Sequence, residues 1–181
     1  MRARLMVATS FLCAACSATT DASSNAKVYT GTYSVDVVES TVSTSLTGGG
    51  TFPCTNTYRM SGALTMSINS AASTGSSLGT AQIAGTQKEI AHSTANSCVA
   101  KGDLSTVWSP NLTGTTGDLR FASQNVVPNG SYVVTSKTSF AGALANGVVT
   151  GQLTFSVAGS GTIGTTSIVQ SYATTTNVSL R

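Results

Sequence analysis

Charged side chains are scarce in this chain of 181 residues. Asp, Glu, Lys and Arg make up only 8% of it, about a third of the usual fraction near 25%. The formal net charge of +3 includes Arg2 and Arg4, which lie in a segment that we expect to be removed. Without them seven basic residues (nine minus two) stand against six acidic ones. Because no Lys/Arg run with interleaved aromatics occurs, we expect no nucleic-acid partner.

Residues that perform acid–base chemistry are equally scarce. His92 is the only histidine, and nothing in the sequence brings it together with the candidate orienting acids Asp36, Asp103 and Asp118. Asp36 and Glu39 form the nearest acidic pair, but residues three apart at a strand end point to opposite faces. Solvated surface carboxylates are the simpler interpretation. We therefore expect no catalytic residues and no enzyme.

Two short motifs lack the context that their chemistry needs. Gly75-Ser-Ser-Leu-Gly79 matches the G-x-S-x-G nucleophile elbow, which requires a strand, a sharp turn and a helix. Gly159-Ser-Gly-Thr-Ile-Gly164 matches G-x-G-x-x-G, yet it leaves no room for a nucleotide-binding unit behind it. A hairpin turn explains the second motif better. Neither motif predicts a cofactor, and we expect none.

The N-terminal segment is typical of an exported protein. Residues 1–4 carry two arginines, and Leu5–Ala15 is an uncharged apolar stretch as long as the hydrophobic region of a signal peptide. It is too short to span a bilayer as a helix. We expect a signal peptide at residues 1–15, a small polar tether at 16–27 and a single β domain at 28–181.

Two cleavage sites compete in this segment. Leu12-Cys-Ala-Ala-Cys16 resembles the lipobox of bacterial lipoproteins, in which the final cysteine is acylated before cleavage. The resemblance implies that Cys16 carries a lipid anchor. With Ser17 after it, the resemblance also implies a membrane partner in the bacterial cell envelope, the outer membrane. The alternative is ordinary signal-peptidase cleavage after Ala18, which would leave a secreted protein.

Cys54 and Cys98 remain once the signal segment is excluded. An even pair of cysteines in an exported protein favours a disulfide. Closing a loop of about 45 residues would stabilise the fold by about 4 kcal/mol in the chain-entropy model. The alternative is a metal site of Cys54, His92 and Cys98. It lacks a fourth ligand and paired-cysteine spacing, so we expect no metal.

Alternation of apolar and polar residues predicts an all-β protein with few or no helices. The clearest period of two runs through Tyr58–Asn69 and Val149–Val157. Weaker strand candidates are Tyr29–Val38, Thr80–Ser93, Asp103–Trp108, Leu119–Val127, Ser131–Phe140 and Thr162–Leu180. Pro128-Asn129-Gly130 predicts a turn. Short links favour an antiparallel meander that forms a single barrel or a two-sheet sandwich.

Four functional hypotheses remain. The first is a non-enzymatic envelope lipoprotein with a binding or structural role, whose protein or small-molecule partner is unknown. The second is a carrier that holds a small apolar ligand inside a barrel. The third is an integral outer-membrane barrel, which the 6% aromatic content does not favour. The fourth is a carboxylate-dependent hydrolase.

A void in the barrel centre would favour the carrier, and a filled centre would favour the structural role. The two faces expected to enclose a ligand are Tyr58/Met60/Leu64/Met66/Ile68 and Val149/Leu153/Phe155/Val157. No residue beyond Cys16, Cys54 and Cys98 receives a specific role.

Overall fold

The structure, a computed structural model, describes residues 26–70, 78–93, 98 and 102–181. Nine β-strands and no helix occupy these ranges, so they contain no helix that could span a membrane. The strands are β1 (Ala26–Ser45), β2 (Thr51–Asn69), β3 (Gly79–His92), β4 (Leu104–Trp108), β5 (Asn111–Thr115), β6 (Asp118–Asn129), β7 (Tyr132–Ala145), β8 (Val148–Ile163) and β9 (Thr166–Leu180). The expected signal peptide, Cys16 and the first three residues of the G-x-S-x-G match at 75–79 lie outside the described residues.

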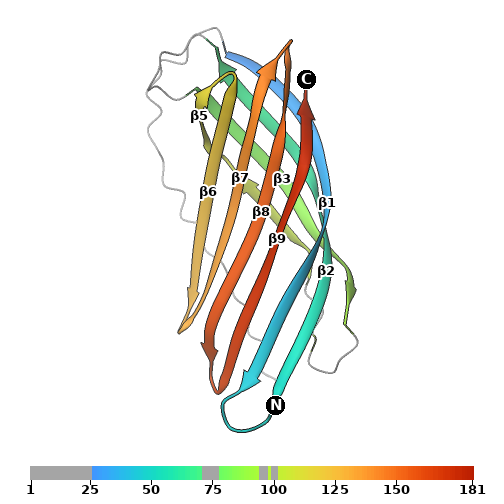
Figure 1. The fold of residues 1–181 in the computed structure, drawn as a ribbon, viewed down its shortest axis with the longest axis vertical. Coiled ribbons are helices and arrows are strands. Elements are labelled where there is room, and N and C mark those ends of the chain that lie inside the picture. Colours follow the sequence, from blue (N-terminus) through green and yellow to red (C-terminus); the bar gives the residue numbers. More distant parts are fainter. Residues whose placement is uncertain (1–25, 71–77, 94–97, 99–101) are drawn as a thin grey trace.

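The strands form one antiparallel meander that closes on itself (Figure 1). Except for β4 and β5, which both pair with β3, strands that follow one another in the chain are neighbours in the sheet. β2 pairs with both β1 and β3, and β9 returns to pair with β1 over Ser40–Ser45. The predicted all-β antiparallel meander is confirmed, and its form is a barrel. Closure pairs the first and last strands, which would otherwise be exposed edges prone to aggregation.

Several strand limits differ from those that the sequence predicts. β1 extends seven residues beyond Val38, to Ser45, and β5 is a strand that the pattern does not predict. The segment predicted as one strand from Thr162 contains the turn between β8 and β9, where Gly164 has φ = 58°. Of the predicted turn at 159–164, only Gly164 lies in a turn. The predicted turn between β6 and β7 lies at Gly130, with φ = 63°.

The inner face of the barrel is apolar at one end. Alternate residues of each strand point inward, and the core includes Leu64, Ile83, Leu119, Leu153 and Leu180, each fully buried. Phe121 and Phe140 stack within it, with ring centroids 5.6 Å apart. Burial of this inner face supplies the main driving force for folding.

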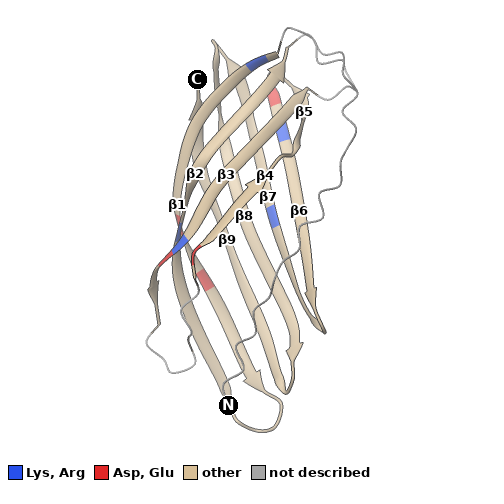
Figure 2. Ribbon diagram, turned by 180° about the vertical axis from the view of Figure 1, so that it is seen from behind, with Lys and Arg blue, Asp and Glu red and all other residues tan. Residues whose placement is uncertain are grey.

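The outer face of the barrel carries many hydroxyl side chains, together with exposed apolar residues such as Val38, Val107 and Val169. Ser139, Thr154 and Thr175 form one outward row across β7, β8 and β9, and the Oγ1 atoms of the two threonines lie 3.0 Å apart. Figure 2 shows how sparse the charges are. Asp36 pairs with Arg59 at 2.7 Å on this face, and the guanidinium holds the pKa of that carboxyl below its usual value.

β4 and β5 continue one another along the same neighbour, β3. Pro110 separates them, because proline has no N–H to donate to a sheet. Its carbonyl oxygen still accepts a hydrogen bond from the Ala81 N–H at 2.9 Å. β6 pairs with β5 at only three positions, 118–120, and no pairing joins β4 to β6 in the described part of the chain.

Candidate ligand pocket in the barrel interior

A pocket of about 160 Å³ lies inside the barrel, level with β4. Seven strands contribute to its wall, which is mainly apolar: Tyr33, Met60, Gly85, Thr86, Gln87, Leu104, Thr106, Trp108, Ser136, Val157 and Tyr172. An apolar cavity of about 150 Å³ holds one benzene molecule. The pocket therefore has room for a ligand about the size of a single six-membered ring.

Aromatic side chains form much of the pocket wall. Tyr33 and Trp108 both pack against Phe155, with ring centroids 5.4 Å and 6.3 Å apart. Phe155 is 1% exposed and belongs to the core, so the pocket begins where the packed end of the barrel stops. Tyr172 lies opposite Val157 in the β8–β9 register and supplies a third ring.

The Tyr33 side chain lines this pocket and carries a hydroxyl group. Tyr33 is 5% exposed, and its hydroxyl makes no hydrogen bond to the described part of the chain. Every fully buried polar side-chain atom among the described residues has a hydrogen-bond partner. Since the Tyr33 oxygen has none there, it must retain some solvent-accessible surface. Burial raises the pKa of Tyr33, so the hydroxyl stays neutral at physiological pH and can donate or accept a hydrogen bond.

A buried polar cluster lies beside the pocket around Glu39, which is 2% exposed. Gln170 Nε2 donates a hydrogen bond to Glu39 Oε2 at 2.7 Å, and the Tyr132 hydroxyl donates to Gln170 Oε1 at 2.6 Å. The hydroxyls of Thr41 and Tyr58 approach Glu39 Oε1 at 3.4 Å and 3.5 Å. These hydrogen bonds help to hold the carboxyl group of Glu39 in one position.

The tyrosines around Glu39 resist ionisation. Burial raises the pKa of Tyr172 to about 12, with a further contribution from the charge of Glu39. The pKa of Tyr58 is also raised to about 12, again mainly by burial, against the opposing hydrogen bond that Asn56 Nδ2 donates to its hydroxyl at 3.0 Å. These phenols remain neutral in the folded protein well above physiological pH.

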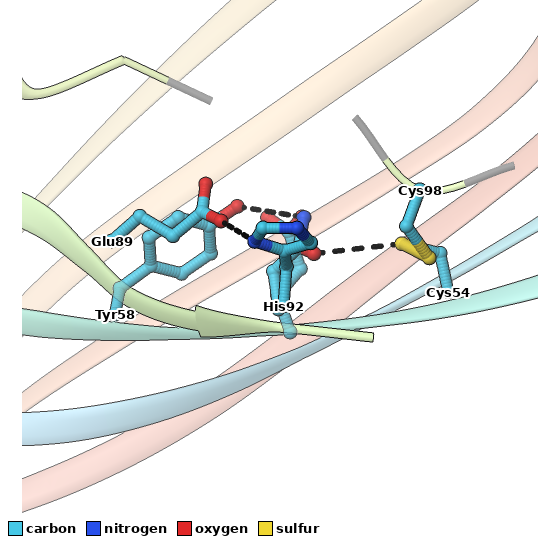
Figure 3. A network of polar contacts seen from close by, with 7 residues as sticks. Cys54, Tyr58, Glu89, His92 and Cys98 are labelled. Carbon is cyan, nitrogen blue, oxygen red and sulfur yellow. Dashed lines mark hydrogen bonds and ion pairs between the residues drawn. A yellow bond between two sulfur atoms is a disulfide. The ribbon is translucent and has the colours of Figure 1, made fainter. Parts of the chain in front are cut away.

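A β-bulge brings Glu89 and His92 to the same face of β3. The β2–β3 register shifts at this point and leaves Ile90 without an opposite residue. Because of the extra residue, side chains three apart lie on the same face of β3, and His92 Nδ1 lies 2.9 Å from Glu89 Oε1 (Figure 3). Strict alternation in an extended strand would have placed them on opposite faces.

The predicted disulfide joins Cys54 to Cys98 next to this ion pair. Cys54 Sγ lies 3.5 Å from Asn56 Oδ1 (Figure 3), which is a packing contact because a disulfide sulfur carries no proton to donate. Both sulfur atoms are bonded to each other, so they are not thiolate ligands. The described residues hold no group of three or more His, Cys, Asp or Glu side chains arranged for a metal ion.

The structure confirms part of the expected interior and corrects one assignment. Met60 and Val157 line the pocket, whereas Leu64 and Leu153 fill the core. Asp36 and Glu39 point to opposite faces as predicted, but they lie in the middle of β1. The interpretation of Glu39 as a solvated surface residue is wrong, because β1 continues past Val38 and carries its alternation inward to position 39.

Sequence reasoning did not identify Tyr33, Trp108 or Tyr172 as a group. Each lies at an inward-facing position in the alternation of a predicted strand, and this alternation is the sequence signal that could have identified them. What the sequence could not reveal is that β1, β4 and β9 meet around one space. No protein-family model, curated protein or solved structure matches this chain.

Proposed function

We propose that this protein is a non-enzymatic, exported binding protein that carries a small, mainly apolar ligand inside its barrel. The pocket lined by Tyr33, Trp108 and Tyr172 is the observation that supports the proposal. One end of the barrel is filled by core side chains, and the interior contains a void beside β4. This arrangement suits a carrier with a solid, stable end and a binding end.

The composition of the wall indicates what kind of ligand would fit. Small-molecule sites are mostly apolar, with a few polar groups that fix orientation. Here Met60, Leu104 and Val157 supply apolar contacts, while the Tyr33 hydroxyl offers one hydrogen bond. A ligand about the size of one ring, with a single polar group, matches both the volume and the chemistry.

The outer face supports a barrel that is surrounded by water. A membrane-spanning barrel presents an apolar band to lipid on most of its strands. The outward positions of β8 carry Thr150, Gln152, Thr154 and Ser156 instead. We accordingly place the barrel beside a membrane rather than within it, with the lipid anchor proposed at Cys16. Ten positions separate Cys16 from Ala26, the first residue of β1 (26 minus 16).

The single tryptophan of the chain provides a direct test of binding. Toluene and cyclohexanol, titrated separately, should change Trp108 fluorescence in a saturable manner and raise the melting temperature. Ser136→Leu should abolish both effects, because the larger side chain occupies the pocket. Thr135→Leu, on the outward side of the same strand, is the matched control and should bind as the native protein does. Absence of saturable binding to either probe would refute the proposal.

A further inference from the structure

One cross-strand row on the inner wall of the barrel contains two glycines. β1, β2, β3 and β4 lie side by side in this order (Figure 2), and their pairing aligns Tyr33, Gly62, Gly85 and Thr106. The two central residues have no side chain, so the wall is hollowed there. The neighbouring rows carry larger side chains: Leu64, Ile83 and Trp108 on one side, and Met60, Gln87 and Leu104 on the other. The glycine row therefore accounts for the position of the pocket.

The Tyr33 side chain extends across this row towards β4. An added Cβ atom on Gly85 would overlap the Tyr33 hydroxyl oxygen, so this oxygen lies over Gly85. Thr106 is paired with Gly85 on β4, and side chains at paired positions are about 5 Å apart. The Tyr33 hydroxyl and the Thr106 side chain therefore lie close together in the pocket wall. Gln87, two residues along β3 from Gly85, supplies an amide to the same part of the wall.

The polar groups of the pocket wall are uncharged. They are the hydroxyl or amide groups of Tyr33, Thr86, Gln87, Thr106, Ser136 and Tyr172. No Asp, Glu, Lys, Arg or His is among the described residues that line the pocket. A charged ligand group would lose its hydration there without contacting an opposite charge in the wall. A ligand hydroxyl, in contrast, can both donate a hydrogen bond to these side chains and accept one from them.

We propose that the pocket selects a neutral aromatic alcohol, a single ring with one hydroxyl group, such as phenol. The inference rests on the proposed function of the pocket and specifies its ligand class. Tyr33 and Trp108 already pack against Phe155 at interplanar angles of 36° and 38°. A ligand ring would extend this cluster in the tilted or offset arrangement that aromatic pairs prefer. Phenol is close to benzene in size, so it fits a space of about 160 Å³.

Phenol and toluene are a matched pair of probes, because they differ only by a hydroxyl group in place of a methyl group. A purely apolar void would favour toluene, since the phenol hydroxyl loses its hydration on binding. Calorimetry on the native full chain should instead show phenol binding about fivefold more tightly than toluene. Cyclohexanol, which keeps the hydroxyl group but has no aromatic ring, should bind more weakly than phenol.

Two variants test where the ligand hydroxyl binds. Tyr33→Phe and Thr106→Val each remove one hydroxyl group from the pocket wall, and each should reduce the preference for phenol over toluene severalfold. Thr32→Val removes an exposed hydroxyl from the outward side of β1, so it should leave the preference unchanged. If Tyr33→Phe does not fold, Thr106→Val decides the question.

Each alternative outcome separates the ligand class from the carrier function. Toluene binding as tightly as phenol, or more tightly, would overturn the inference and leave the proposed carrier intact. The same conclusion would follow if benzylammonium bound more tightly than the neutral benzyl alcohol of similar shape. An unchanged preference for phenol in both Tyr33→Phe and Thr106→Val would also overturn the inference. Absence of binding by all of these probes would overturn both proposals.

Discussion

Glycines inside the barrel make room for aromatic side chains. Gly142 and Gly151 are paired across β7 and β8, and a Cβ atom on Gly151 would stand 2.6 Å from Cζ of the Phe140 ring. Gly85 plays the same role beneath Tyr33. None of these three glycines has a positive φ. They matter because only a residue without a side chain lets a ring lie across the neighbouring strand.

The contact between Gly85 and Tyr33 predicts coupled mutational effects. Gly85→Ala should lower the free energy of unfolding by about 1–3 kcal/mol, because the new methyl group overlaps the Tyr33 hydroxyl. In a Tyr33→Phe background, Gly85→Ala should lower the free energy of unfolding by less, since the hydroxyl is gone. Part of the destabilisation should remain because the Ser61 carbonyl oxygen would lie 2.9 Å from the new Cβ. Urea unfolding of the double-mutant cycle measures this coupling.

Gly117→Ala is the control for this cycle. An added Cβ at Gly117 meets only Thr115 Oγ1, at 4.0 Å, so its effect on stability should be within about 0.5 kcal/mol. If Gly85→Ala lowers the free energy of unfolding equally in the native and Tyr33→Phe backgrounds, the Tyr33 hydroxyl is not the atom that the new methyl group overlaps.

The buried tyrosines predict that stability falls at alkaline pH. Tyr58 and Tyr172 ionise near their ordinary pKa of 10.0 when the chain is unfolded, but only at about 12 in the folded barrel. Because the folded-state pKa values are raised, their contribution to stability is fully present below about pH 10. It is lost as the pH rises from about 10 to about 12.

Urea unfolding at several alkaline pH values measures this loss. Other groups also titrate in this range, so Tyr172→Phe is the comparison: its stability should decline less steeply with pH than that of the native protein. Complete appearance of tyrosinate absorbance in the folded protein near pH 10 would contradict the raised pKa values.

At the scale of elements, two interruptions of regular strands lie near the pocket. Pro110 divides the fourth pass along the barrel into β4 and β5, and the bulge at Ile90 places Glu89 and His92 on the same face of β3. The Cys54–Cys98 disulfide ties β2 to the segment that follows β3 at this same end. Together these features determine which side chains surround the interior near the pocket.

Removal of the disulfide should destabilise the barrel without changing its interior chemistry. The bond closes a loop with a sequence separation of 44, so the double variant Cys54→Ser/Cys98→Ser should lose about 4 kcal/mol of unfolding free energy in the chain-entropy model. Chemical denaturation of native and variant protein tests this. A reducing agent should destabilise the native protein and leave the variant unaffected, and equal sensitivity in both would argue against the bond.

At the scale of the whole molecule, the lipid anchor proposed at Cys16 can be tested independently of the barrel. If the proposed anchor is present, the mass of the mature protein extracted from membranes should begin at Cys16 and include acyl chains, because a lipobox directs both acylation and cleavage. Cys16→Ser should lose the added mass. An unmodified mass that begins near Thr19 would instead show a secreted protein, and the binding test on Trp108 would still apply to it.

Local sequence pattern determined the strands of this protein because side-chain alternation is a property of a few consecutive residues. Tyr58–Asn69 and Val149–Val157 lie within β2 and β8, and both inward faces were correctly identified. The sequence pattern did not predict β5 because its five residues, directly after Pro110, are too few to display an alternation of apolar and polar side chains. The disulfide could also be inferred, since only two cysteines remained to pair.

Only the tertiary structure decided that the sheet closes and where its interior stays open. Closure depends on the register between β1 and β9, whose paired residues Ser40 and Ser171 are more than a hundred positions apart. The same long-range pairing places Glu39 beside Tyr172 and brings Trp108 across from them. Such a constellation has no local signal in the chain, because it arises from the curvature and register of the complete barrel.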